Sequence, residues 1–193
     1  MLDTGLDNEQ REYVQTIQGS AESLLGIVND ILDISRIESG KLIIEPIAFS
    51  LRNTVIDVIG LLGKKAEAKG IALETRIDPE LPMLLEGDPV RLRQILINLT
   101  SNAIKFTNKG GSVNLKLICN DTKGEDARLF VIVEDTGRGM NSREIEEQKD
   151  AGQLLSLNYD EEKKTGLGLA ISKKFTELFN GKIWLESSKK GTN

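Results

Sequence analysis

Hydrophobic residues recur through residues 8–38 at alternating spacings of three and four, which is the heptad pattern of helices packed in a bundle. The stripe consists of Val14, Ile17, Ala21, Leu24, Val28 and Ile31. The pattern predicts one long helix that begins near Asp7 or Asn8 and ends at Gly40. A stripe of this length needs helical partners, so we expect a helical hairpin or a dimeric bundle; the alternative is an ordinary core helix.

From residue 41 onward, helical and strand-like patterns alternate irregularly. Helices are predicted at 51–68, 89–107 and 166–180, and strands at 41–46, 71–77, 112–119, 128–135 and 182–187. Residues 79–89 are predicted to be a connection and residues 120–127 a hairpin turn. The apolar run at 128–135 predicts a strand buried on both faces, and the alternation in 112–119 points Cys119 into the core. The predicted fold class is α+β: a long helix followed by an α/β sandwich, one mixed sheet with helices on a single face.

Composition narrows the range of functions. The 193 residues are 39% hydrophobic and 28% charged, which is ordinary for a soluble globular protein. The net charge of −5 argues against nucleic-acid binding, and one cysteine with no histidine argues against disulfides and zinc. Low cysteine use and the lack of a membrane-spanning run lead us to expect a cytoplasmic location. The polar, acidic start reads as the interior of a longer protein.

The stretch NLTSNAIKFT, residues 98–107, places polar groups on an otherwise apolar helix. Asn98 and Asn102 are i,i+4 neighbours, so their amides stand together, and Lys105 lies one turn beyond Asn102. Amide oxygens beside a cation suit Mg²⁺ and the phosphate oxygens that it carries. The alternative is that both asparagines face solvent and Lys105 extends into water.

Two glycine-containing stretches follow. DTGRGM (135–140) ends a predicted strand at Asp135, whose carboxylate can accept a hydrogen bond from an exocyclic amine such as that of adenine, while Gly137 and Gly139 allow close approach to a flat ring. The alternative is a tight turn with a local Asp135 hydrogen bond. TGLGLA (165–170) opens a helix whose free N–H groups can bind phosphate; the alternative is a flexible loop end. The spacings match neither the dinucleotide fingerprint nor the P-loop.

In this order, the three stretches resemble the N, G1 and G2 boxes of sensor histidine kinases, in the GHKL group that also contains Hsp90, gyrase B and MutL. The flanking stretches DPVRLRQILINLTSNAIKFT and ILDISRIESGKL resemble hybrid-type kinases. The resemblance implies the Bergerat ATP-binding fold and places Asn98 and Asn102 near Mg²⁺, Lys105 near the phosphates and Asp135 on adenine. It implies an ATP or ADP pocket shaped by Gly137, Gly139, Thr165, Gly166, Leu167, Gly168 and Leu169. It also makes Gln94, Asn98 and Lys105 candidates for catalytic residues. Of these, Gln94 is the group expected to orient the accepting imidazole.

The sequence departs from that family in two places. The family carries its phosphorylated histidine on the helix before the one at 8–38, and this chain has no histidine. We therefore interpret residues 1–40 as a partial dimerisation and phosphotransfer segment, and residues 41–193 as the catalytic ATP-binding domain. The second departure is the lid segment 141–164, which lacks phenylalanine and has Lys163 and Lys164 in place of glycines. Its only apolar candidates for lid anchors are Leu154, Leu155, Leu157 and Tyr159.

Three functions follow from these observations. The first is a kinase fragment that binds ATP and Mg²⁺ and forms a homodimer through residues 8–38. Its parent protein would transfer the γ-phosphoryl group to a histidine and act with a response regulator receiver domain. The second is a degenerate interaction module that acts through dimerisation. The third, an ATPase of the Hsp90 or MutL kind, fits the boxes but not the heptad helix.

Overall fold

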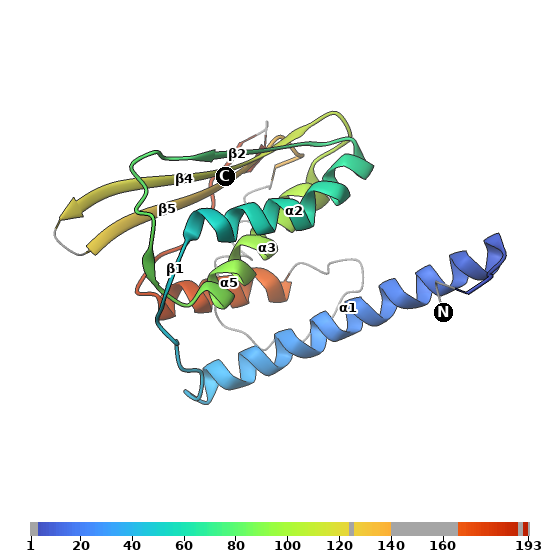
Figure 1. Cartoon of the computed structure of the whole chain (residues 1–193), viewed down its shortest axis with the longest axis horizontal. Coiled ribbons are helices and arrows are strands. Elements are labelled where there is room, and N and C mark those ends of the chain that lie inside the picture. The colour runs from blue at the N-terminus through green and yellow to red at the C-terminus, as the bar shows by residue number, and fades with distance from the viewer. Residues whose placement is uncertain (1–3, 124–125, 140–165, 189–190, 193) are drawn as a thin grey trace. The chain divides into compact units, whose positions relative to one another are not determined.

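The computed structural model describes residues 4–123, 126–139, 166–188 and 191–192 of the chain (Figure 1). These residues fall into two compact units, Met1–Ile43 and Ile44–Asn193. None of the helices in the described part of the chain is long and apolar enough to cross a membrane.

The first unit contains the helix α1, Asn8–Glu38, as the heptad pattern predicts. Asp7 caps its start: the Asp7 carboxylate accepts the Gln10 N–H at 2.8 Å, and the Gln10 side chain accepts the Asp7 N–H at 3.2 Å. The helix ends at Ser39, and Gly40 takes a left-handed φ of 62°. Apart from the half-buried Val14, the predicted apolar stripe is exposed on this helix, with Ile17 at 67%, Leu24 at 61% and Ile31 at 54% accessibility.

The second unit begins with a strand of a small two-stranded sheet and two capped helices. The strand β1 (Ile47–Phe49) pairs antiparallel with β3 (Leu85–Gly87). The helix α2 (Leu51–Lys69) begins at the Ser50 cap and ends at Gly70, whose φ of 69° favours glycine. The helix α3 (Pro89–Phe106) begins at Asp88, whose carboxylate accepts the N–H groups of Val90 and Arg91, both at 3.1 Å.

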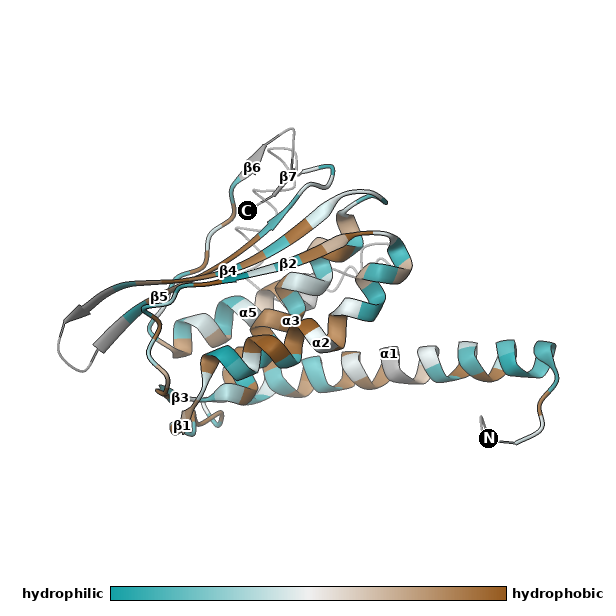
Figure 2. Ribbon diagram, turned by 45° about the horizontal axis from the view of Figure 1, so that its top comes forward, coloured by the Kyte–Doolittle hydropathy of each residue, from teal (hydrophilic) through white to brown (hydrophobic). Residues whose placement is uncertain are grey.

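A three-stranded mixed sheet forms the other layer. It has the order β2–β4–β5, with β2 (Ala72–Ile77) parallel to β4 (Ser112–Lys123) and β4 antiparallel to β5 (Asp126–Asp135). The helices α2, α3 and α5 (Gly166–Leu178) lie on one face of this sheet, so the prediction of a mixed sheet with helices on a single face is confirmed (Figures 1 and 2). The chain closes with the short pair β6 (Ser187–Ser188) and β7 (Gly191–Thr192).

The hydrophobic core lies between the helices and the sheet. Figure 2 shows hydrophobic residues along α2, α3 and the sheet strands. The core consists of Leu51, Val55, Val58, Leu62, Ala66, Ile71, Leu81, Leu96, Ala103, Ile104, Val113, Leu115 and Leu117. Cys119 is half-buried and packs against this core, as its alternating pattern predicts.

Several predicted strands differ from the structure. Residues 41–46 are not a strand; pairing begins at Ile47, because a strand needs a partner and β3 opposes only Ile47–Phe49. The strand β3 lies inside the predicted connection and was too short to show a periodic pattern. The prediction of a strand at 182–187 is also wrong: only its last residue pairs, and Trp184 instead packs edge-on against Phe130, with ring centroids 6.4 Å apart.

The two long strands also depart from their predicted form. Both β4 and β5 extend into the predicted turn at 120–127, of which residues 124–125 lie outside the described part. The prediction that β5 is buried on both faces is wrong, since its residues 129–135 are half-buried. The physical reason is that helices cover only one face of the sheet, and the other face carries Phe130 against Trp184.

Candidate functional site

The asparagines of α3 lie on the side of the helix that meets α5. Asn98 and Asn102 are both half-buried, which disagrees with the alternative that they simply face solvent. The Asn98 Nδ2 atom donates a hydrogen bond of 3.1 Å to the backbone oxygen of Gly168 in α5. Residues 70 positions apart in the chain are thereby joined, and the stretches NLTSNAIKFT and TGLGLA form one site.

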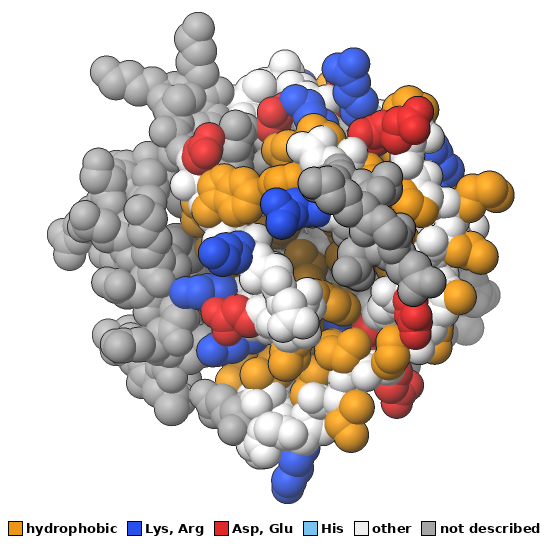
Figure 3. Space-filling view, turned by 90° about the vertical axis from the view of Figure 1, so that its left-hand side faces the viewer, with side chains coloured by type: hydrophobic (Ala, Val, Ile, Leu, Met, Phe, Trp, Pro, Cys, Tyr) orange, Lys and Arg blue, Asp and Glu red, His pale blue; other side chains and the backbone are white. Residues whose placement is uncertain are grey.

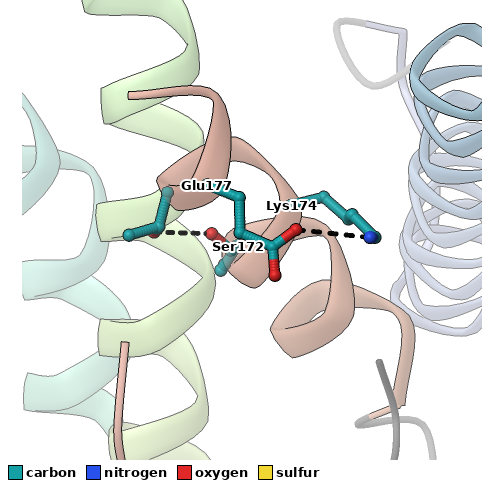
Figure 4. A network of polar contacts seen from close by, with 4 residues as sticks. Ser172, Lys174 and Glu177 are labelled. Atoms are coloured by element: carbon teal, nitrogen blue, oxygen red, sulfur yellow. Dashed lines mark hydrogen bonds and ion pairs between the residues drawn. The ribbon is translucent and has the colours of Figure 1, made fainter. Parts of the chain in front are cut away.

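The Gly168 carbonyl receives a second side-chain donor. The Ser172 hydroxyl donates to it at 2.8 Å, and one turn later the Thr176 hydroxyl donates to the Ser172 oxygen at 2.7 Å. Figure 4 shows Ser172 within α5 together with the surface pair Lys174–Glu177. Ser172 is fully buried, so the bond to Gly168 is shielded from water. Sequence reasoning missed Ser172, although its position four residues after Gly168 is the usual spacing for this type of helix bond.

The remaining residues predicted around TGLGLA are only partly described. Gly166 is the first residue of α5, and Gly168 and Leu169 are half-buried in its first turn. Thr165, the side chain of Leu167 and the lid segment 141–164 lie outside the described residues.

The carboxyl end of β5 forms the second part of the site. Asp135 is half-buried, and its Oδ1 atom accepts the N–H of Gly137 at 2.7 Å. The local turn bond that was the alternative interpretation is therefore present. Because each carboxylate oxygen has two lone pairs, this bond does not exhaust the acceptor capacity of Asp135.

Gly137 has no space for a side chain. A Cβ atom built on it would lie 2.5 Å from the Phe106 oxygen and 2.7 Å from Asp135 Oδ1. The turn therefore packs directly on the last residue of α3, which brings DTGRGM beside the end of NLTSNAIKFT. Gly139 has a φ of 69°, a backbone conformation that favours glycine.

Thr136 fastens the same turn to the sheet. Its N–H donates to the Ser112 oxygen at 3.1 Å, and its hydroxyl accepts the Ser112 N–H at 2.8 Å. These bonds continue the β4–β5 ladder past Asp135 and fix the direction in which Asp135 leaves the sheet. Sequence reasoning had assigned no role to Thr136.

The C-terminal end of α3 carries basic groups. The exposed Lys105 has its Nζ atom 5.2 Å from the centroid of the Phe106 ring, and the Arg138 guanidinium lies 5.8 Å from the same centroid. From α2, the Lys69 ammonium donates to the backbone oxygens of Ile104 at 2.8 Å and Lys105 at 2.6 Å. Lys69 thus satisfies helix carbonyls that have no partner within α3, a contact that the sequence did not reveal.

Gln94 lies one turn before Asn98 on α3. Its Oε1 atom accepts from Arg91 Nη1 at 3.5 Å, and the Arg91 guanidinium lies 5.2 Å from the centroid of the Phe175 ring in α5. An amide cannot act as a base, so the only catalytic role open to Gln94 is orientation. That role stays a prediction.

The donor set can be compared with the needs of Mg²⁺. The described residues contain no group of three or more His, Cys, Asp or Glu side chains placed to hold a metal. Mg²⁺ bound to nucleotide keeps several waters and takes phosphate oxygens, so it needs few protein ligands. A backbone carbonyl can only accept, so Nδ2 of Asn98 must face Gly168, and Oδ1 faces away from it. An amide oxygen of this kind fits the cation.

Comparison with known proteins shows the family to which the chain belongs. The family described as "Histidine kinase-, DNA gyrase B-, and HSP90-like ATPase" matches residues 87–193, and the "His Kinase A (phospho-acceptor) domain" matches residues 1–40. The chain is 41% identical over 184 residues to "Sensor protein GacS" of Pseudomonas syringae pv. syringae, covering 95% of this chain and 20% of that protein. It is 43% identical over 187 residues to "Sensory/regulatory protein RpfC" of Xanthomonas campestris pv. campestris, covering 93% of this chain and 25% of that protein.

Solved structures of histidine kinases are also similar to this chain. The structure of ShkA full-length in complex with AMPPNP has a TM-score of 0.77 and 28% identity, covering 99% of this chain and 38% of that chain. Histidine kinase ThkA in complex with the response regulator protein TrrA has a TM-score of 0.66 and 26% identity, covering 99% of this chain and 52% of that chain.

The mixed sheet with helices on one face, and a polar site walled by α3, define an ATP-binding α/β sandwich. The chain belongs to the histidine kinase-, DNA gyrase B- and HSP90-like ATPase family, and its relatives include sensor proteins and a "Hybrid signal transduction histidine kinase L" of Dictyostelium discoideum. It spans only 20–25% of the length of the two relatives named above.

Proposed function

We propose that residues 44–193 bind ATP or ADP with Mg²⁺, and that the parent protein transfers the γ-phosphoryl group to a histidine. The observation that carries this proposal is the dual contact of α3. Its residue Asn98 bonds to Gly168, and its residue Phe106 packs on the turn that holds Asp135. Eight helical residues span about 12 Å, which is the scale of an extended nucleoside diphosphate.

The proposed roles follow the chemistry of each group. Asp135 accepts from the adenine amine, Asn98 and Asn102 offer amide oxygens to the cation, and Lys105 lies near the phosphates. When bound, Mg²⁺ would neutralise phosphate charge during transfer. The protein's own contribution is to hold the nucleotide in place against a wall that is already formed.

Titration with Mg·ADP tests the proposal. We expect measurable heat and, at a ligand concentration of 100 times Kd, a stabilisation of about 2.7 kcal/mol. For a unit of this size, that corresponds to a rise in Tm of roughly 5–10 °C. Asn102→Ala should weaken binding, whereas Asn120→Ala, at an exposed position of β4, is the matched control. Absence of both heat and thermal shift in the wild-type protein would leave the interaction module as the better hypothesis.

We also propose a homodimer through α1, which the exposed stripe favours. Buried apolar surface is worth about 25 cal/mol per Å², so covering this stripe with that of a second copy would contribute several kcal/mol. Because the same patch would meet itself, the arrangement would be symmetric. Light scattering should show dimers for the wild type and monomers for the double variant Leu24→Glu with Val28→Glu. A monomeric wild type at high micromolar concentration would end the dimer proposal.

The remaining partners concern the parent protein. We propose that it serves a response regulator receiver domain, supported by the ThkA structure, which contains a response regulator. We propose no nucleic-acid partner, in keeping with the net charge of −5. On the face drawn in Figure 3, the described Lys and Arg side chains are interspersed with acidic and hydrophobic ones rather than forming a continuous basic surface. A cytoplasmic location is likewise a proposal.

A further inference from the structure

Mg²⁺ generally prefers carboxylate oxygens, yet the proposed site offers amides at positions 98 and 102. For Asn98 the structure supplies a reason. Its Nδ2 atom donates to the Gly168 oxygen at 3.1 Å, and an aspartate at this position would place an oxygen against that oxygen. Asn98 must therefore be an amide if the contact with α5 is to exist.

Both the donor and the acceptor of the hydrogen bond between Asn98 and α5 are held in place by their surroundings. The Gly168 oxygen is fixed by the fully buried Ser172, whose hydroxyl donates to it at 2.8 Å. A Cβ on Gly168 would lie 3.4 Å from Asn98 Cγ and 3.5 Å from Nδ2, so the amide rests against the helix backbone. The bond crosses between two helices at the first turn of α5, where a helix is otherwise prone to fray.

We propose that Asn98 is a positioning residue that ties the first turn of α5 to α3 and couples that turn to the metal. The inference rests on the proposed nucleotide site. One amide group has both functions: its N–H holds Gly168 while its oxygen faces the cation. A cation on Oδ1 would polarise the amide and strengthen the hydrogen bond that Nδ2 donates to Gly168, so bound Mg²⁺ would reinforce the tether and order α5. Nucleotide without Mg²⁺ lacks this effect.

The substitution Asn98→Asp separates the two functions, because it keeps a metal-binding oxygen and removes the N–H donor. Asn102→Asp is the matched control: it adds the same charge one turn along α3, and the described residues give the Asn102 side chain no bond to α5. Both variants are expected to raise the Mg²⁺ dependence of ADP affinity, since a carboxylate attracts the cation and repels uncomplexed ADP. Only Asn98→Asp should loosen α5.

The deciding readout is hydrogen exchange of the Ser172 backbone amide, whose position in α5 pairs it with the carbonyl of Gly168 in the first turn. We expect the amide of Ser172 to exchange about fivefold faster in Asn98→Asp without ligand, which is the size of one hydrogen bond of about 1 kcal/mol. In the wild type, Mg·ADP should slow this amide more than ADP with chelator does. Equal exchange in Asn98→Asp and Asn102→Asp, or no difference between ADP with and without Mg²⁺, would overturn the proposal.

Two further outcomes keep the tests of this inference and of the proposed function apart. If Asn98→Asp does not fold, the side chain of wild-type Asn98 still reports on the tether. One of its two Nδ2 protons should exchange more slowly than the other, and equal rates would overturn the proposal. If the wild type binds no ADP at all, the proposed function fails, and the coupling to the metal fails with it. If ADP binds but α5 does not respond to Asn98→Asp, only the present inference fails.

Discussion

Replacing Asp135 by asparagine is expected to reverse the base preference of the nucleotide site. In the structure, Asp135 Oδ1 accepts the Gly137 N–H at 2.7 Å, and Thr136 is held to Ser112 on the neighbouring strand. The asparagine oxygen will therefore keep the bond to Gly137, and its NH₂ group will take the place of Oδ2. A donor then faces the adenine amine, which is also a donor.

The magnitudes separate the effect on binding from the effect on stability. A hydrogen bond to a charged group is worth roughly 1.5–3 kcal/mol, so ADP affinity should fall about 10- to 150-fold. The turn bond survives but becomes neutral, which costs on the order of 1 kcal/mol of folding free energy and lowers Tm by roughly 2–4 °C. Inosine diphosphate has a carbonyl oxygen in place of the amine, so its affinity relative to ADP should rise.

Calorimetric titration of both nucleotides with Mg²⁺ measures this preference. The control is Asp57→Asn on the exposed face of α2, which makes the same change in charge away from the site. Unchanged ADP affinity in Asp135→Asn, with no gain for inosine diphosphate, would refute the assignment of Asp135 as the adenine reader. A loss for both nucleotides in equal proportion would instead mean that the substitution acts through the turn.

Three other predictions test different parts of the molecule. Gly137→Ala should lower both Tm and ADP affinity, because its Cβ would lie 2.5 Å from the Phe106 oxygen; unaltered thermal unfolding would contradict this packing. Thr100→Val should raise Tm by roughly 2–4 °C, since the buried Thr100 hydroxyl has no hydrogen-bond partner among the described residues and removing it should gain about 1 kcal/mol; a lower Tm would show that the hydroxyl is satisfied. Finally, γ-labelled ATP should leave no acid-labile label on this chain, which contains no histidine, and such label would refute that expectation.

The sequence predicted best those elements that carry their own end signals. The bounds of α1, α2 and α3 were predicted to within one residue: Asp7, Ser50 and Asp88 cap their starts, and Gly40 and Gly70 mark two of their ends. The failures were in short strands. A three-residue strand such as β1 or β3 is defined by its partner across the sheet, and pairing is not visible in a local hydrophobic pattern.

The same distinction applies to the site. The three polar stretches could be found locally because each interrupts an apolar pattern, although the roles of their residues stay predictions. Their supports could not be found in this way. Lys69 reads as one more surface lysine at the end of α2, and only the fold brings its ammonium to the carbonyls of α3. The Gly168 oxygen, which also accepts the Ser172 hydroxyl, likewise gains Asn98 as a donor only through a contact between helices far apart in sequence.

The polar groups on α3 follow from its position as a shared wall. Leu96 and Ile104 face the sheet and are fully buried, and this anchors the helix whatever its other side carries. Lys69 then fastens its C-terminal end, and the Asn98 bond fastens its middle to α5. Because the helix is anchored in this way, it can present amides and an ammonium at fixed positions, and ligand binding then carries no further entropy cost for ordering them. Preorganised polar groups of this kind stabilise charge more effectively than groups that must first be ordered, which is why the amides belong on a core helix rather than on a loop.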